Sequence, residues 1–231
     1  MIIPVASFAF AVFGLPERLI TSSIAIAAVL ALVIEFGLSF SGTFDKAISR
    51  TASSFAVIMY PGYLVMYLAI MTVWHDAGTI LSLFFLMVFG CDSIAWLFGV
   101  LLGKNNRGLV PASPKKSIAG FIGAANAFFV IGDEIVTSAL NGSILPGIAF
   151  YVYFPAVFGG SLWKILLLGV MTAAASIVGD IIESVLKRSA GVKDSGSIIP
   201  GRGGVLDSID SILLAAPVFY ILCDFLYGFG A

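Results

Sequence analysis

Charged side chains are scarce in this chain. Among 231 residues there are 12 Lys and Arg and 13 Asp and Glu, so that 11% of the chain is charged, whereas soluble domains have about 25%. The net charge is −1, so no basic surface points to nucleic acid and we expect no such partner. Hydrophobic residues make up 60% of the sequence. This balance excludes an ordinary soluble domain and predicts an integral membrane protein.

Cysteine and histidine are nearly absent. Cys91 and Cys223 both lie in apolar runs, so we interpret them as small hydrophobic residues rather than a disulfide or a metal pair. His75 is the only histidine and cannot supply a histidine-rich metal site. The opening residues, MIIPVASFAFAVFG, lack the basic segment and cleavage site of a secretory signal peptide. We expect them to be the remainder of a membrane helix.

Apolar runs occupy most of the chain. A spanning helix needs about 20 largely apolar residues, and the candidate spans are 2–14, 19–40, 52–74, 79–102, 118–140, 144–160, 162–186 and 209–229. The connections between them are short, and no internal repeat is visible. We predict an all-α fold, a polytopic membrane bundle of about 7–9 transmembrane or partly embedded helices. It forms one domain, 1–231, with N-terminal helices in 1–78 and catalytic helices and loops in 79–231.

Two loops carry most of the basic residues. Residues 103–116 (GKNNRGLVPASPKK) and 187–208 each contain four Lys or Arg, which marks both as cytoplasmic. An even number of crossings must then separate them, but three candidate spans lie between them. We expect 144–160 to be the segment that does not cross fully, because it contains Pro146 and Pro155.

A few charges fall inside or beside apolar runs. Asp92 lies within MVFGCDSIAWLFGVLLG, where a carboxylate costs roughly 2.5–3.5 kcal/mol and needs a partner or a wet cavity. The alternative is that Asp92 lies near the helix end and is solvated. We expect Glu35 to be solvated near the end of its span, and Asp133 and Glu134 to mark a loop or an interface.

Nine charged residues gather in one stretch, 179–211. Asp180 and Glu183 are three residues apart, so on a helix they share a face, which Ser184 and Lys187 extend by one turn. Asp194, Asp207 and Asp210 follow further along the chain. Several carboxylates without thiol or imidazole ligands would suit a hard ion, Mg²⁺ or Mn²⁺. Mg²⁺ typically takes one or two carboxylates together with substrate phosphates.

The same stretch contains groups suited to phosphate. Its cations are Lys187, Arg188, Lys193 and Arg202, and PGRGG (200–204) offers backbone N–H groups that can approach phosphate oxygens. The other basic loop adds Lys115 and Lys116. A basic patch that only binds anionic lipid headgroups is the alternative. It accounts for the cations but not for the interleaved carboxylates and glycines, so we favour a metal–phosphate site.

Two separated motifs resemble those of phosphatidate cytidylyltransferases (CDP-diacylglycerol synthases). The run GDIIESVLKRSAGVKDSGSIIPGRGGVLDSIDS is similar to the family's G-D-L-x-E-S, S-x-x-K-R-x4-K-D-x-G, P-G-H-G-G and D-R-x-D. CDSIAWLFGVLLGK followed by SPKKSIAG is similar to its D-[ST]-x-A-aromatic-x-x-G-x-x-x-G-K and S-P-K-K-[ST]-x-E-G. The resemblance covers roughly 90–125 and 175–215, and the opening residues match only the tail of the family's first helix, so we expect a shortened N-terminus.

The resemblance implies transfer of a cytidylyl group from CTP to phosphatidate, giving CDP-diacylglycerol and pyrophosphate. It implies Mg²⁺, alone or with a second cation, and as partners CTP, phosphatidate, membrane lipids and a second copy in a homodimer. The expected location is the bacterial cytoplasmic membrane, with the site facing the cytoplasm. The implied metal ligands are Asp180, Asp207, Glu183 and Asp210. The implied catalytic residues are Lys115, Lys116, Lys187, Arg188, Lys193, Asp194 and Arg202. The implied substrate-binding residues are Ser113, Ser184, Gly201, Gly203, Gly204 and Asp92, the last as a buried carboxylate supporting the lysine pair.

Three positions depart from that pattern. Ala119 stands where the family has Glu, Arg202 where it has His, and Ser208 where it has Arg. Arg202 keeps a cation but cannot shuttle protons, because a guanidinium does not deprotonate near neutral pH. The alternatives are a CTP-dependent kinase of an isoprenoid alcohol, a transporter or channel, and a non-catalytic relative. A transporter would carry charge along several mid-membrane helices and show repeat symmetry, and neither is seen in the sequence.

Overall fold

The computed structural model describes residues 17–40, 46–108, 110–114, 116–122, 162–201 and 203–229. Within these ranges the chain is helical, and its only extended pairings are isolated backbone bridges. Among the described residues, four helical stretches are long and apolar enough to cross a membrane: Ala47–Met71, Ala77–Leu101, Leu167–Ser189 and Leu206–Tyr227. The predicted all-α membrane class is therefore confirmed for the described residues. The chain divides into two compact units, Met1–His75 and Asp76–Ala231.

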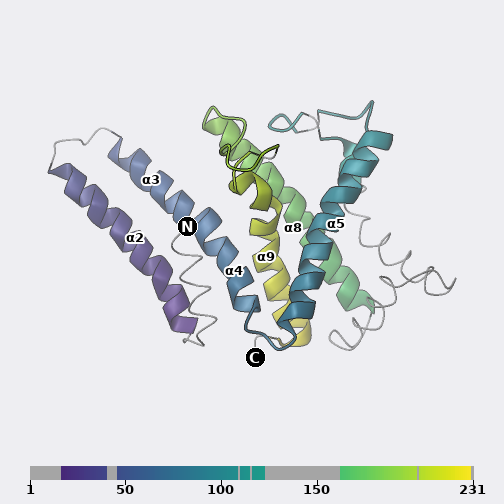
Figure 1. Ribbon diagram of the computed structural model, residues 1–231, viewed down its shortest axis with the longest axis horizontal. Helices are drawn as coiled ribbons and strands as arrows, with labels where there is room; N and C mark the ends of the chain where they lie inside the picture. The colour runs from purple at the N-terminus through teal and green to yellow at the C-terminus, as the bar shows by residue number, and fades with distance from the viewer. Residues whose placement is uncertain are drawn as a thin grey trace. The chain divides into compact units, whose positions relative to one another are not determined.

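The first unit contains a helical hairpin (Figure 1). Helix α2 (Glu17–Ser39) packs against α3 (Ala47–Val57) and the π-helix η1 (Ile58–Tyr63), which continues into α4 (Leu64–Met71). Pro61 lies inside η1; because proline has no N–H and its ring crowds the preceding turn, the helix adopts a wider turn at this point. Many of the large apolar side chains of α2 are exposed, as expected of a surface that meets lipid.

One ion pair joins the two arms of this hairpin. The Arg50 guanidinium donates to Glu35, with Nη2 2.6 Å from Oε1 and Nε 3.2 Å from Oε2. Glu35 was expected to be solvated near the end of its span; its side chain is 19% exposed, and it also has Arg50 as a partner. The hairpin brings α3 back beside α2, and a residue 15 positions away becomes its partner.

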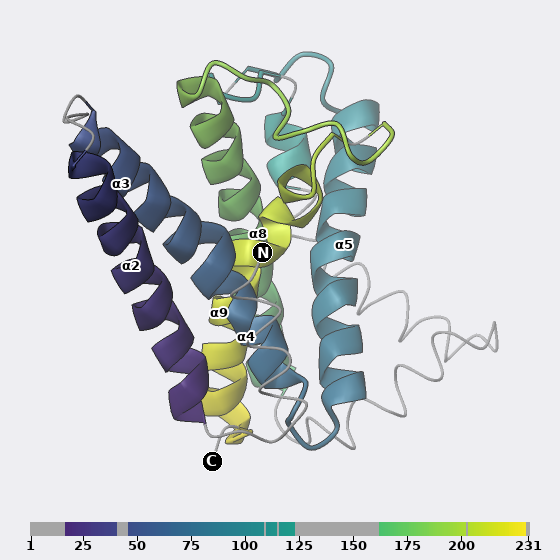
Figure 2. The same ribbon diagram turned by 60° about the vertical axis from the view of Figure 1, so that its left-hand side comes forward.

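The described part of the second unit contains three long helices: α5 (Ala77–Leu101), α8 (Leu162–Ser189) and α9 (Leu206–Tyr227). Helix α9 packs along α8, and α5 contacts both (Figure 2). Phe84 of α5 meets Phe219 of α9 with ring centroids 5.2 Å apart. Cys91 and Cys223 are buried and form no disulfide among the described residues, which confirms their interpretation as small core residues.

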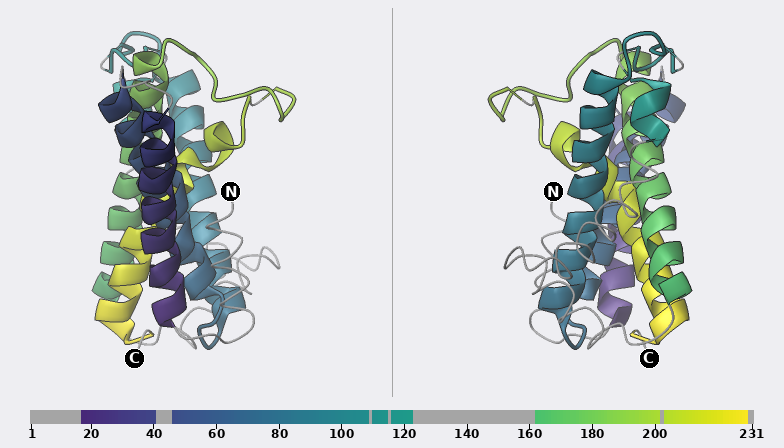
Figure 3. Two further views of the ribbon diagram at one scale, coloured as in Figure 1. Left: turned by 90° about the vertical axis from the view of Figure 1, so that its left-hand side faces the viewer. Right: turned by 90° about the vertical axis from the view of Figure 1, so that its right-hand side faces the viewer.

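The directions of these helices bring the two basic loops together. Helices α5 and α8 end, and α9 begins, at the same end of the second unit, so the loops after α5 and after α8 share that end (Figure 1). The loop after α8 extends away from the helices there (Figure 3). The sequence prediction that the two basic loops face the same side agrees with this arrangement.

Most of the predicted spans can be compared with the structure. The spans 52–74, 79–102, 162–186 and 209–229 correspond to the four apolar helical stretches, and 19–40 corresponds to α2. The expected segments 2–14 and 144–160, and 118–140 beyond residue 122, lie outside the described residues. So do Lys115, Asp133, Glu134 and Arg202.

Gly179 allows α8 and α9 to approach closely next to the charged stretch. A Cβ at Gly179 would lie 2.7 Å from the backbone oxygen of Asp210 and 3.2 Å from Cβ of Leu214. Backbone atoms cannot move aside as a flexible side chain can, so the two helices would have to separate.

Gly179→Ala is expected to lower the melting temperature of the purified protein. The added methyl group should cost about 1–3 kcal/mol of unfolding free energy, as overpacking does. Gly78→Ala is the matched control, because a Cβ at Gly78 meets nothing within 4 Å and alanine favours a helix over glycine. Thermal unfolding in detergent measures both variants. Equal melting temperatures would contradict the close approach.

Candidate active site

The loop after α5 is folded back on that helix by a small buried node. Ser117 is 3% exposed and its Oγ accepts a hydrogen bond from the N–H of Gly120 at 3.0 Å. A Cβ at Gly103 would lie 2.6 Å from this Oγ, and one at Gly120 would lie 2.9 Å from the backbone oxygen of Ala95. These glycines therefore let residues 117–122 lie directly against the end of α5.

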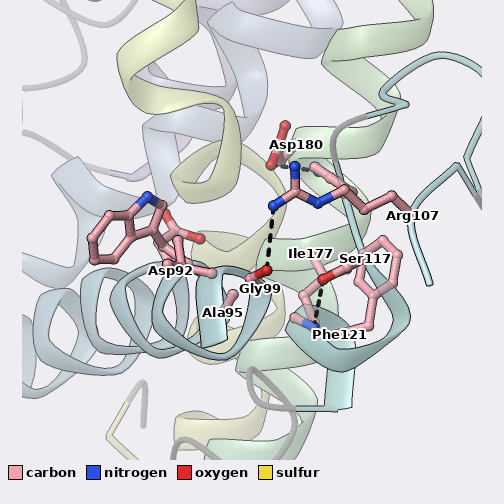
Figure 4. A pocket seen from close by; sticks show the side chains of 12 residues that line it. Asp92, Ala95, Gly99, Arg107, Ser117, Phe121, Ile177 and Asp180 are labelled. Carbon is pink, nitrogen blue, oxygen red and sulfur yellow. Dashed lines mark hydrogen bonds and ion pairs between the residues drawn. The ribbon is translucent and has the colours of Figure 1, made fainter. Parts of the chain in front are cut away.

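Beside this node lies a cavity of about 430 Å³ (Figure 4). It is formed by α5, by Arg107 and residues 116–121, and by α8. Its apolar lining includes Ala95, Trp96, Val100, Phe121 and Ile177, and its charged lining is Asp92, Arg107, Lys116 and Asp180. An amphipathic cavity of this size suits a molecule with a charged group and an apolar body.

An ion pair between Lys116 and Asp180 spans the cavity wall. It joins the loop after α5 to α8, so two motifs 64 positions apart in the sequence meet here. Asp92 lines the same cavity, but its side chain is exposed. The prediction that Asp92 is buried is therefore wrong, whereas its place in a cavity agrees with the expectation for a carboxylate inside an apolar run.

A second charged cluster lies between α8 and α9. Lys187 Nζ is 2.6 Å from Glu183 Oε2 and 2.6 Å from Asp207 Oδ1. Glu183 is fully buried, and its second oxygen, Oε1, has no hydrogen-bond partner among the described residues. Glu183 and Lys187 are one helical turn apart, as the sequence predicted for one face of a helix.

Asp207 holds the loop between α8 and α9. Its Oδ2 accepts hydrogen bonds from the N–H of Ser195 at 2.8 Å, the Oγ of Ser195 at 2.7 Å and the N–H of Gly204 at 2.7 Å. Together with Lys187, four donors surround this one carboxylate. The loop is thus fastened to the first turn of α9, three residues after Gly204.

The glycines of PGRGG serve this packing. A Cβ at Gly203 would lie 2.7 Å from Asp207 Oδ2, and one at Gly204 would lie 2.3 Å from Ser195 Oγ. Gly203 also has a φ of 99°, a left-handed conformation that glycine adopts without strain. Its N–H donates to the carbonyl of Ile199 at 3.0 Å. In this arrangement the N–H groups of Gly203 and Gly204 are engaged within the loop, where the sequence analysis expected them to meet phosphate.

Asp210 lies between the two clusters. Its carboxylate interacts electrostatically with those of Asp180 and Glu183, and its Oδ1 accepts the N–H of Ser211 at 2.7 Å. Over the described ranges no three Asp, Glu, His or Cys side chains converge to hold a metal ion by themselves. Two neighbouring carboxylates, Asp180 and Asp210, do fit an ion that takes its other ligands from phosphates and water.

The other predicted residues lie around these clusters. Arg188 bridges the two loops weakly, with Nε 3.4 Å from the carbonyl of Ala112 and Nη1 3.4 Å from that of Val192. Lys193, Asp194 and Gly201 lie exposed in the loop after α8. Ser113 and Ser184 are half-buried, in the loop after α5 and on α8. Lys115 and Arg202 lie outside the described residues.

Three residues of the site escaped the sequence analysis. Arg107 lines the cavity, Ser117 caps the segment beneath it, and Ser195 binds Asp207. Arg107 was counted among the basic residues of its loop without a role of its own. Ser117 stands at the Ser/Thr position of the S-P-K-K-[ST] motif but was given no role, and Ser195 gave no signal, because a hydrogen bond to a residue 12 positions away leaves no local pattern.

Comparison with known proteins adds an independent observation. A sequence model described as "Cytidylyltransferase family" matches residues 1–226. A protein of Helicobacter pylori named phosphatidate cytidylyltransferase is 33% identical over 169 residues, which cover 73% of this chain and 55% of that protein.

Two further relatives carry the same name. The protein of Synechocystis is 36% identical over 140 residues, which cover 59% of this chain and 40% of the relative. The protein of Haemophilus influenzae is 38% identical over 149 residues, which cover 63% of this chain and 46% of the relative. The chain thus spans about half the length of the curated relatives it matches.

Proposed function

Since this chain belongs to the cytidylyltransferase family, we propose that it transfers a cytidylyl group from CTP to phosphatidate. The products are CDP-diacylglycerol and pyrophosphate. The observation that supports this reaction best is the amphipathic cavity with the Lys116–Asp180 pair in its wall. It offers an apolar surface and cations to one substrate, and Arg188 at the end of α8 contacts the loop that forms part of its wall. The names of the relatives agree with it.

The reaction needs little base catalysis. Phosphatidate is already an anion, and one of its phosphate oxygens attacks the α-phosphorus of CTP while pyrophosphate leaves. The protein must bring two polyanions together and align them, which positioned cations accomplish. Lys115 and Lys116 hold the phosphatidate phosphate or the α-phosphate. Arg188, Lys193 and Arg202 hold the triphosphate and the departing pyrophosphate, while Lys187, paired with two carboxylates, braces the start of their loop. Their positive charge offsets the repulsion between the substrates.

We assign the Mg²⁺ ion to Asp180 and Asp210. When bound, the ion neutralises phosphate charge that would otherwise oppose the attack. Asp207 and Glu183 have a different part, because Lys187 lies 2.6 Å from each of them. They hold this lysine between α8 and α9, and Asp207 also holds the loop. Substrate phosphates would complete the coordination of the ion, as is usual for Mg²⁺.

The basic loops suggest the orientation of the protein. Both lie at the end of the second unit where α5 and α8 end, and cytoplasmic loops are rich in Lys and Arg. We therefore propose a bacterial cytoplasmic membrane location with the site facing the cytoplasm, CTP entering from the cytosol and phosphatidate from the bilayer. The count of about 7–9 helices, the single domain 1–231 and the homodimer stay predictions.

CTP labelled at its α-phosphate should transfer its label to the lipid, and CTP labelled at its γ-phosphate should not. The test uses the full chain in detergent micelles with phosphatidate, with Mg²⁺ or with a chelator, and separates lipid from nucleotide by chromatography. Mg²⁺ removal should abolish transfer. Label that enters lipid from the γ-phosphate, with an isoprenoid alcohol as acceptor, would instead identify a kinase. No transfer of either label would contradict both reactions.

A further inference from the structure

Arg107 lies in the cavity wall because the backbone places it there. Residues 107 and 117 form an antiparallel bridge, the N–H of Gly108 donates to the carbonyl of Lys116 at 3.3 Å, and that of Ile118 donates to the carbonyl of Asn106 at 3.0 Å. Paired residues in such a bridge have their Cα atoms about 5 Å apart. Arg107 is therefore a close neighbour of Lys116, fixed by the same loop.

The two cations differ in what already binds them. Lys116 is paired with Asp180. The guanidinium of Arg107 makes one long hydrogen bond within the described part of the chain, from Nη2 to the carbonyl of Gly99 at 3.4 Å (Figure 4). A guanidinium has five N–H donors in a planar fork that matches two phosphate oxygens. Most of these donors remain for a ligand in the cavity.

The apolar side of the cavity indicates which ligand this is. Trp96 and Val100 line it and also belong to the exposed apolar side of α5, where their residues are 69% and 48% exposed. Tryptophan is typical of the membrane–water boundary. A ligand whose phosphate reaches Arg107 can therefore extend along Trp96 and Val100 toward lipid. A lipid with a terminal phosphate can place its phosphate at Arg107 and its acyl chains against the apolar lining. A triphosphate chain would leave the apolar lining without a partner.

We propose that Arg107 is a lipid-binding residue that holds the phosphate monoester of the lipid substrate in this cavity, with Trp96 and Val100 against the first part of its acyl chains. The inference relies on the proposed function for the lipid's role as substrate, but binding can be measured without turnover. Arg107 thus favours lipids that end in a phosphate monoester over those whose phosphate is esterified or absent.

Arg107→Gln should weaken binding of dioctanoyl phosphatidate to the full chain in detergent by about tenfold or more, since a charge-assisted pair is lost. Arg107→Lys keeps the charge but loses the planar fork, so its affinity for phosphatidate should lie between those of wild type and Arg107→Gln. Lys46→Gln removes one charge from an exposed lysine of the first unit and should leave binding unchanged. Calorimetric titration measures affinity, and dioctanoylglycerol, which has no phosphate, should bind wild type and Arg107→Gln alike.

Kinetics then identify the substrate that Arg107 contacts. In the transfer assay Arg107→Gln should raise KM for phosphatidate by about tenfold and leave KM for CTP within about twofold. A raised KM for CTP with unchanged phosphatidate affinity would overturn the inference in favour of the nucleotide. Unchanged values for both substrates would also overturn it. If phosphatidate binding depends on Arg107 but no cytidylyl transfer occurs, the inference holds and the proposed function fails. Unchanged melting temperatures show that the variants are folded.

Discussion

Asp180→Asn is expected to reduce cytidylyl transfer by about a thousandfold or more, which corresponds to roughly 4 kcal/mol of transition-state stabilisation. Asp180 is one of the two carboxylates that we assign to the ion, and it is also the partner of Lys116 in the cavity wall. Asparagine keeps the size of the side chain but removes its charge. Transfer of label from the α-phosphate of CTP to lipid, over a range of Mg²⁺ concentrations, measures the effect.

The protein should remain folded after this change. The Asp180 side chain is 32% exposed and lines a cavity rather than the core. The melting temperature of Asp180→Asn should therefore stay close to that of wild type. Asp224→Asn is the matched control, because Asp224 is an exposed carboxylate near the far end of α9. Turnover close to wild type in Asp180→Asn, with an unchanged Mg²⁺ requirement, would refute the assignment of this residue to the ion.

Asp207→Ala is expected to release the loop between α8 and α9. The change removes the acceptor of three hydrogen bonds from Ser195 and Gly204 and one of the two partners of Lys187. Leaving such donors without an acceptor should cost on the order of 3 kcal/mol of stability. Trypsin, which cleaves after Lys and Arg, should then cut at Lys193 at least about tenfold faster, because local opening exposes the backbone.

Loop release should also reduce activity. Lys193 and Arg202 lie in this loop, so transfer should fall by about a hundredfold or more when they are no longer positioned. Ser195→Ala is the graded comparison, since it removes one hydroxyl group and leaves the N–H groups in place. The rate of tryptic cleavage and the rate of cytidylyl transfer of Ser195→Ala should both lie between those of wild type and Asp207→Ala. Equal rates of proteolysis in all three proteins would mean that Asp207 does not hold the loop.

The sequence predicted some of these relationships because they are local. Glu183 and Lys187 are one turn apart on a single helix, and an amphipathic or charged face follows from helical spacing alone. The apolar spans follow from their length, since about 20 residues are needed to cross a membrane. The isolated cysteines in apolar runs follow from composition. None of these inferences depends on how two helices pack against each other.

Other relationships required the tertiary structure. Nothing in the sequence indicated that Arg50 pairs with Glu35, and the resemblance implied burial for Asp92, whose exposed side chain lines the cavity. The PGRGG segment has the composition of a phosphate-binding loop, yet Gly203 and Gly204 pack against Asp207 and Ser195. In each case the partner is 12 or more positions away or lies on another element. The spacing of residues carries no information about such a contact.

The sequence by itself determined that this is an apolar helical chain with two charged loops, because hydropathy and helical period are properties of neighbouring residues. It also determined which residue types are present for binding phosphate and a hard metal ion. Only the tertiary structure decided which of them meet: Lys116 with Asp180, Lys187 with Glu183 and Asp207, and Arg107 beside the cavity. The close approach of α8 to α9 at Gly179 and the backbone bridge at Arg107 set these pairings, and both depend on contacts between segments far apart in the chain.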